Sequence, residues 1–152
     1  MGILCVLDTF EGRLTAVSAG HLLPVVLRGQ RVVPVADIGG LPIALLDNTK
    51  YEDLTVQLEP GDRVYLFSDG IIEQASPAGR GTLFGQDRLV DLLLAGHARD
   101  LDQVVTHEMD ALVGWAGGRR FADDVSLVAL EWTRGLQQDL RTWFSGSGRT
   151  RE

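Results

Sequence analysis

The sequence predicts an α+β fold in which antiparallel strands come first and helices follow. Short apolar runs separated by turn signals fill the N-terminal half, two stretches with apolar residues at helical spacing lie between residues 86 and 116, and a last apolar run follows them. The chain has 152 residues, of which 45% are hydrophobic, so it is long enough for one domain with its own core.

The apolar runs of the N-terminal half predict three hairpins. Residues 3–8 and 13–19 flank the turn signal "TFEG", and residues 24–35 turn at Gly29 and Gln30. Residues 54–58 and the strand "RVYLF" flank "EPGD", which predicts the third hairpin. The segment 37–53 has no clean period and is predicted to be an irregular connection.

The C-terminal half predicts a loop, two helices and a strand. The Pro and Gly content of residues 75–85 indicates the loop, and apolar spacing predicts helices over 86–98 and 100–116, the second capped by Asp100 or Asp102. The final strand is predicted at 125–132. We expect the polar tail 134–152 to be partly disordered, which leaves 1–133 as the folded domain.

Charge and cysteine content exclude several classes of protein. A net charge of −7 argues against a nucleic-acid surface, whereas a divalent cation or a basic partner is easier to accommodate. Cys5 is the single cysteine, so an intramolecular disulfide is excluded and a cysteine-based zinc site is disfavoured. No apolar run has the length of a membrane span and the N-terminus lacks a signal-peptide pattern, so we expect no membrane segment and a cytoplasmic location.

Three aspartates lie at strand ends. Asp69 follows the apolar run "VYLF", while Asp123 and Asp124 come directly before the last strand. If these strands are antiparallel neighbours, their carboxylates converge, and such hard oxygen ligands suit magnesium or manganese. Asp and Gly are also common turn residues, so the pattern alone leaves ordinary turns equally open.

Four segments in order, "SAGHLLPVVLRG", "LEPGDRVYLFSDGIIEQ", "LFGQDRLVDLL" and "FADDVSLVAL", resemble the PPM (PP2C-type) protein phosphatases of the bacterial SpoIIE/RsbU-like branch. The resemblance runs over residues 4–132. It implies a four-layer αββα sandwich with a binuclear Mn²⁺ or Mg²⁺ centre, in which Asp69 and Asp123 are metal ligands. Asp124 is implied as neighbouring support, and Gly70 as the small residue that lets backbone approach the metal side.

Other positions differ from the family pattern. Gly20 and His21 belong to "SAGH", in which Ser18 replaces the usual asparagine, and we predict a structural turn there rather than a chemical role for the histidine. Ala44 stands where relatives usually carry glycine, in a segment that the resemblance treats as regulatory. His97 and His107 lie on helical segments, where a lone histidine is more often structural than a ligand.

The resemblance also implies that an N-terminal part is missing. Relatives begin earlier, with a D-x-x-G-H-G-type motif whose aspartate bridges the two metals, and the sequence contains no such motif. The chain is therefore expected to be the C-terminal portion of the domain, with weakened metal binding and uncovered strand edges that favour self-association.

Three functions follow as hypotheses. The first is a metal-dependent serine/threonine phosphatase acting on a phosphoprotein, such as an anti-sigma-factor antagonist. The second is a catalytically incomplete module, or pseudophosphatase, that acts by binding a protein partner. The third is a generic α+β binding domain in which the acidic turns are only turns.

Overall fold

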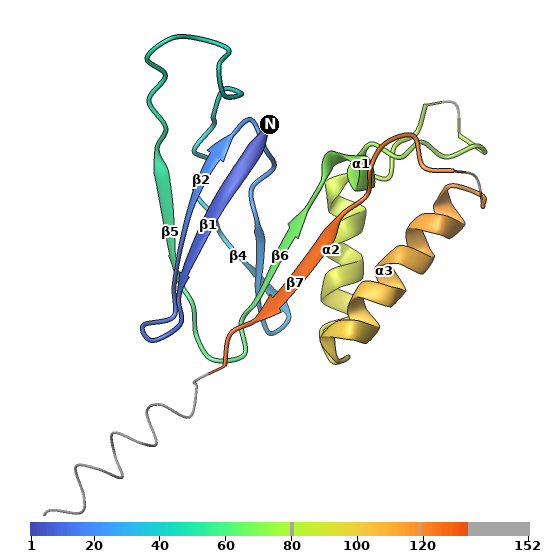
Figure 1. Ribbon diagram of the computed structural model, residues 1–152. Coiled ribbons are helices and arrows are strands. Elements are labelled where there is room, and N and C mark those ends of the chain that lie inside the picture. The colour runs from blue at the N-terminus through green and yellow to red at the C-terminus, as the bar shows by residue number, and fades with distance from the viewer. Residues whose placement is uncertain (80, 119, 134–152) are drawn as a thin grey trace, which may run out of the picture.

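The fold combines two antiparallel sheets with two helices that pack on one of them (Figure 1). It was obtained as a computed structural model and is described for residues 1–79, 81–118 and 120–133. One sheet has the strand order β1-β2-β5 and the other the order β4-β3-β6-β7. The strands are β1 (Gly2–Asp8), β2 (Arg13–Ala19), β3 (Val25–Arg28), β4 (Arg31–Val33), β5 (Asp53–Gln57), β6 (Arg63–Phe67) and β7 (Leu127–Glu131).

The first two predicted hairpins are confirmed. β1 pairs with β2 up to Asp8 opposite Arg13, and the Asp8 carboxylate accepts hydrogen bonds from the backbone N–H groups of Phe10 and Glu11 in the turn. β3 pairs with β4 up to Arg28 opposite Arg31, with Gly29 in the left-handed region at φ 56°. Local turn chemistry therefore determines both hairpins.

The third predicted hairpin is wrong, because β5 and β6 belong to different sheets. β5 pairs with β2, whereas β6 lies between β3 and β7. The burial of the two strands explains the difference. β5 alternates buried and exposed residues, as in a sheet with one solvated face, whereas β6 is covered on both faces and so takes a central position.

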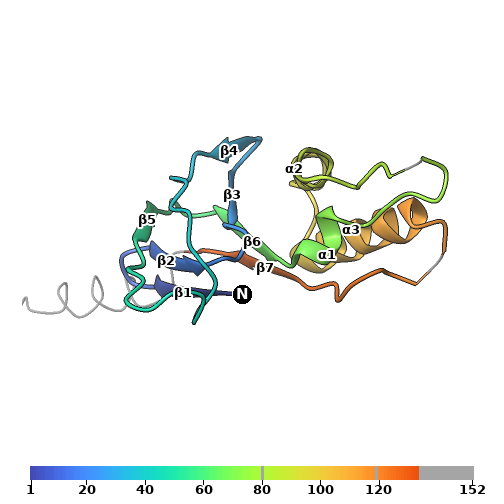
Figure 2. The same cartoon turned by 90° about the horizontal axis from the view of Figure 1, so that it is seen from above.

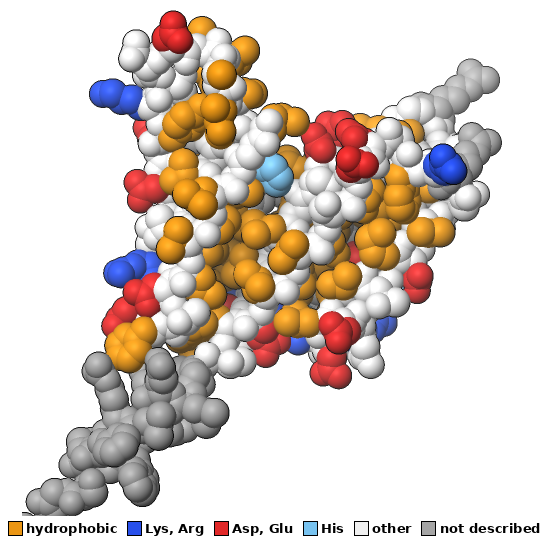
Figure 3. Space-filling view, viewed as in Figure 1, with side chains coloured by type: hydrophobic (Ala, Val, Ile, Leu, Met, Phe, Trp, Pro, Cys, Tyr) orange, Lys and Arg blue, Asp and Glu red, His pale blue; other side chains and the backbone are white. Residues whose placement is uncertain are grey.

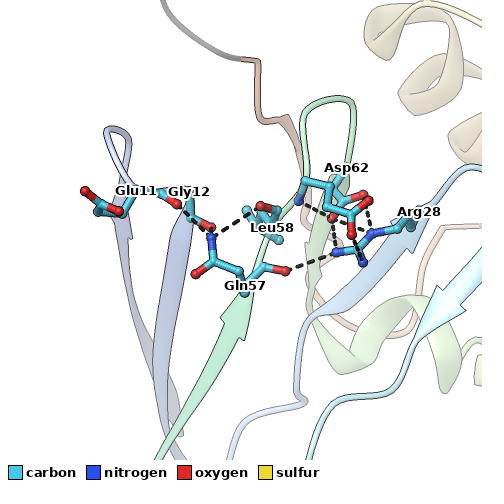
Figure 4. A network of polar contacts seen from close by, with 7 residues as sticks. Glu11, Gly12, Arg28, Gln57, Leu58 and Asp62 are labelled. Atoms are coloured by element: carbon cyan, nitrogen blue, oxygen red, sulfur yellow. Dashed lines mark hydrogen bonds and ion pairs between the residues drawn. The ribbon is translucent and has the colours of Figure 1, made fainter. Parts of the chain in front are cut away.

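A polar network holds the crossing between the sheets (Figure 4). Arg28 donates from Nε and Nη2 to the carboxylate of Asp62, which is 1% exposed, and Nη2 also donates to the Gln57 carbonyl. Gln57 Nε2 donates to the Glu11 carbonyl in the β1–β2 turn at 2.7 Å. The network thus ties the chain between β5 and β6 to both sheets.

Two apolar cores lie on opposite sides of β6. Figure 2 shows β6 and β7 between the strands β1, β2 and β5 on one side and the helices on the other. Val64 packs between the sheets with Leu14, Val26 and Trp132. Tyr65 and Phe67 face the helical layer and pack with buried side chains of the helices, which include Leu89, Leu93, Val104 and Leu112. β6 is therefore held rigidly up to its last residue.

The predicted helices are observed as α2 (Gln86–Ala95) and α3 (Leu101–Trp115), and a short α1 (Asp69–Ile72) was not predicted. α2 ends earlier than expected, with Gly96 at its C-cap position, and Asp100 occupies the N-cap position of α3. The irregular connection is confirmed over residues 37–52, whereas the tail 134–152 lies outside the described residues. None of the helices in the described ranges is long and apolar enough to cross a membrane.

The predicted α+β class with two packed antiparallel sheets is confirmed. Helices cover the outer face of the four-stranded sheet. On β1, Leu4 and Val6 are 66% and 58% exposed, and no helix of the described ranges covers that face. The described residues thus form three layers of the four that the family resemblance implies.

Candidate functional site

The antiparallel pairing of β6 with β7 brings the aspartates to one end of the sheet. Phe67 pairs with Leu127, and beyond this pair the Ser68 N–H donates to the Ser126 carbonyl at 3.0 Å. Asp69 directly follows this point on one chain segment, and Asp123 precedes it on the other. The pairing that the sequence analysis assumed for these two strands is therefore confirmed.

Ser68 fastens the two segments together through its side chain. Its Oγ donates to the Asp124 carbonyl at 2.9 Å and accepts from the Ser126 N–H at 2.9 Å. This role of Ser68 was not predicted from the sequence. Its position directly before an aspartate at the end of a buried strand is the signal that points to this role.

Gly70 lets the backbone of Asp124 pass directly beside α1. A β-carbon at position 70 would lie 2.4 Å from the Asp124 carbonyl oxygen, closer than side chains approach backbone in proteins. Asp69 is half-buried in the first turn of α1, while Asp123 and Asp124 are exposed. The Asp124 N–H donates to Asp123 Oδ1 at 2.7 Å, which orients the carboxylate of Asp123.

Gln74 anchors the segment that precedes Asp123. Its side chain is buried, and its Oε1 accepts a hydrogen bond from the Ala122 N–H at 3.1 Å. Its backbone carbonyl accepts from Trp115 Nε1 at 2.9 Å and from the Phe84 N–H at 2.9 Å. Sequence reasoning missed Gln74, because nothing in the pattern indicates that its amide reaches across to residue 122.

A pocket of about 500 Å³ opens beside Asp69. Its lining combines the N-terminal residue with parts of α1 and of the turn after β2, namely Met1, Gly20, His21, Leu22, Ser68, Asp69, Ile72 and Glu73. Figure 3 shows a histidine near a group of acidic side chains at this end of the molecule. The pocket is therefore polar and anionic on the side of α1.

The predicted turn at Gly20 and His21 is present. Ser18 Oγ accepts from the His21 N–H at 3.1 Å and donates to the His21 carbonyl at 2.7 Å, so the serine side chain closes this turn. The His21 ring donates from Nδ1 to the Leu22 carbonyl at 2.9 Å. Of the three histidines only His21 lines the pocket beside Asp69; His97 and His107 do not.

The candidate metal ligands are of the type that a hard divalent cation prefers, but there are too few of them to complete a coordination shell. Asp69 and Asp123 supply carboxylate oxygens, the ligands that Mg²⁺ and Mn²⁺ prefer. Within the described ranges, no group of three or more His, Cys, Asp or Glu side chains is arranged to hold a metal. A cation bound here would complete its coordination with water or with groups from outside these residues.

The two antiparallel sheets with helices packed on one of them form three of the four layers of a PP2C-like fold. The chain belongs to the SpoIIE family, because the family model described as "Stage II sporulation protein E (SpoIIE)" matches residues 2–133. No curated protein matches the sequence.

Solved structures agree on the fold. The SiaA-PP2C domain of Pseudomonas aeruginosa is 24% identical, with a TM-score of 0.66 over 80% of this chain and 47% of that chain. The phosphatase domain of SpoIIE from Bacillus subtilis, presoaked with Mn, is 17% identical, with a TM-score of 0.68 over 88% and 57%.

A third structure holds the RsbU and RsbW domains of Rv1364c from Mycobacterium tuberculosis. It is 21% identical, with a TM-score of 0.72 over 94% of this chain and 44% of that chain. The chain thus spans about half the length of the solved structures that it matches.

Proposed function

We propose that the chain forms the C-terminal part of a metal-dependent protein serine/threonine phosphatase. The observation that carries the proposal is the β6–β7 pairing, which brings Asp69 and Asp123 to one end of a rigid sheet, where Asp69 lines an open pocket. Carboxylates held on a rigid scaffold are what a metal-assisted phosphoryl transfer needs from its protein.

In this proposal Asp69 and Asp123 hold Mn²⁺ or Mg²⁺, and Asp124 supports them. When bound, the ions supply an activated water and neutralise the charge of the phosphoryl group. Residues of the chain do the positioning. Ser68 holds the two segments together, Gln74 fixes the approach to Asp123, and Gly70 gives the backbone room.

The substrate class in this proposal is a phosphoserine or phosphothreonine side chain on a regulatory protein. An anti-sigma-factor antagonist is the substrate that the SpoIIE/RsbU-like branch suggests. A cytoplasmic location stays a prediction from the sequence, as does the division of the chain at residue 133.

The alternative is a catalytically incomplete module that binds a protein partner. The shortage of metal ligands in the described residues favours it. A phosphatase domain completed with an N-terminal portion would hydrolyse phosphoserine, whereas a binding module would not. Reconstructing the complete domain therefore distinguishes the two functions.

The test is a fusion that places the N-terminal portion of a family phosphatase upstream of Ile3. We expect Mn²⁺-dependent hydrolysis of a phosphoserine peptide by the fusion and little hydrolysis by the chain alone. Asp69→Ala or Asp123→Ala should abolish this turnover, whereas Asp110→Ala on the exposed face of α3 should leave it unchanged. A folded, metal-loaded fusion without turnover would favour the binding module.

Calorimetry of the chain alone tests the ligand assignment separately. We expect weak Mn²⁺ binding that Asp69→Asn or Asp123→Asn lowers further, because each change removes an anionic oxygen ligand. Binding that neither change affects would contradict the assignment.

A further inference from the structure

The connection between β4 and β5 exposes four large apolar side chains within six residues. Figure 1 shows this connection extending beyond the strands at the upper left, and Figure 3 shows apolar side chains on it. Their exposed fractions are 42% for Leu41, 72% for Ile43, 59% for Leu45 and 62% for Leu46. Clustered exposure of this kind marks interaction sites more often than scattered single residues do. We call residues 41–46 the apolar loop.

The apolar loop is attached to the turn after β2. A β-carbon at Gly40 would lie 2.1 Å from the Ser18 carbonyl oxygen, so backbone meets backbone there. Pro42 packs on Gly20, where a β-carbon would lie 2.9 Å from its ring. The Leu45 N–H donates to the Pro42 carbonyl at 3.2 Å, which closes a turn inside the loop. The loop thus has a defined base and a defined bend.

The same turn forms one wall of the pocket beside Asp69. Gly20 contacts Pro42 and also lines that pocket together with His21. The base of the apolar loop and the pocket are therefore joined through a single residue. A macromolecule whose side chain enters the pocket lies close to the loop, whereas a small phosphate ester need not reach it.

The charge of the segment that contains the apolar loop indicates which kind of partner the loop can bind. The segment 37–53 carries Asp37, Asp47, Glu52 and Asp53 but only one base, Lys50. An anionic lipid surface would be repelled by this balance, since interfacial binding segments are rich in Lys and Arg. A protein surface with an apolar patch bordered by basic residues is complementary to it.

We propose that the apolar loop is the docking site for the phosphoprotein substrate, which contacts it through an apolar patch next to the phosphorylated residue. The inference rests on the proposed function, because it takes the pocket beside Asp69 as the phosphate site. The loop then contributes affinity for protein substrates and nothing for small phosphate esters.

The test uses phosphoserine peptides in which a Leu-Ile pair is moved along a basic background, with binding measured by fluorescence anisotropy in Mn²⁺. We expect at least one placement to bind about tenfold more tightly than the same peptide with serines in place of the pair. The double change Ile43→Ser with Leu46→Ser should remove this gain. Val113→Ser, which alters an apolar residue of α3 that is 44% exposed, should keep it.

Several results would overturn the inference. These are the absence of peptide binding, the absence of a gain from the apolar pair, and a gain that persists in the loop variant. Sedimentation with phosphatidylglycerol vesicles, or a concentration-dependent mass of the chain, would also overturn it if the loop variant abolished either one. The loop would then serve a membrane or a second copy instead.

The fusion separates this inference from the proposed function. If the fusion hydrolyses the peptides at a rate that depends neither on the apolar pair nor on the loop substitutions, the docking site alone is contradicted. Peptide binding that shows the apolar gain, without hydrolysis by the fusion, would contradict the proposed function alone.

Discussion

The carbonyl oxygen of Asp124 lies 2.4 Å from the position that a β-carbon on Gly70 would occupy. Gly70→Ala should therefore push the segment 123–124 away from α1. We expect a loss of about 1–3 kcal/mol in the free energy of unfolding, as for other overpacked sites. We also expect weaker Mn²⁺ binding, because Asp123 moves with the segment. Urea unfolding and calorimetry measure the two effects.

Gly114→Ala is the matched control for this change. Gly114 lies in α3 with no atom within 4 Å of the β-carbon position, so alanine should stabilise the helix by about 0.5–1 kcal/mol. If Gly70→Ala behaves like the control, the close approach of Asp124 does not constrain the site.

Gln74 offers a change that acts on Asp123 without touching a carboxylate. Gln74→Ala removes the acceptor of the Ala122 N–H hydrogen bond and, because Ala122 is exposed, should cost about 0.5–1.5 kcal/mol of unfolding free energy. Mn²⁺ affinity should also fall, because the approach to Asp123 loosens. Gln103→Ala, at an exposed position of α3, should change neither quantity. Unaltered Mn²⁺ affinity in a destabilised Gln74→Ala variant would show that the anchor supports the fold only.

Glu108 makes stability depend on pH. It is 3% exposed in α3, neither carboxylate oxygen has a hydrogen-bond partner among the described residues, and burial raises its pKa to about 7, with Arg99 opposing the rise. Burial raises the pKa of the Tyr65 hydroxyl on β6, the Arg63 guanidinium opposes the rise, and the charge of Glu108 adds to it. The folded state thus holds a proton that the unfolded state releases near its ordinary pKa of 4.5.

The sign follows from this difference. Glu108 does not lower the free energy of unfolding below pH 4.5, where it is protonated in both states. The free energy of unfolding then falls as the pH rises, and this contribution is lost above about pH 7. Glu108→Gln should stabilise the protein by roughly 2–3 kcal/mol at about pH 8 and change little near pH 4.5. Asp110→Asn, at an exposed position of the same helix, should show no such pH dependence. Parallel stability curves for the wild type and Glu108→Gln would contradict the prediction.

The Arg28–Asp62 ion pair should contribute more to the free energy of unfolding than the Arg28–Glu59 ion pair. Asp62→Ala removes the buried carboxylate that accepts hydrogen bonds from Arg28 and should cost about 1.5–3 kcal/mol of unfolding free energy. Glu59→Ala removes an ion pair to the same arginine, but the Glu59 side chain is 62% exposed, so the cost should be about 0–1 kcal/mol. Urea unfolding compares the two. Equal costs would mean that burial does not set the strength of this network.

Ala44 has a left-handed backbone conformation, with φ at 65°. That conformation costs a non-glycine residue about 1–2 kcal/mol, so Ala44→Gly should stabilise the loop by up to about 1 kcal/mol after the entropy of the unfolded glycine is counted. Ala78→Gly, in a loop position without positive φ, should be neutral or destabilising. Thermal unfolding measures both variants. If Ala44→Gly lowered the melting temperature as much as Ala78→Gly or more, Ala44 would not hold the left-handed conformation in solution.

The sequence by itself determined the local structure. Turn residues and alternation predicted the hairpins β1–β2 and β3–β4, because a short turn and a period of two depend only on neighbours along the chain. Helical spacing predicted α2 and α3 for the same reason. Asp69, Asp123 and Asp124 were selected from the sequence because they stand at the ends of apolar strands, although their role as ligands stays a prediction.

Only the tertiary structure decided which segments meet. The pairing of β5 with β2 rather than β6 depends on which faces are buried, and that is settled by the whole core rather than by the turn between the strands. The hydrogen bonds that link Ser68 and Gln74 with residues 122–126 join positions some fifty residues apart. Long-range contacts of this kind leave no periodic signal in the sequence, because each depends on side chains that packing brings together from separate elements.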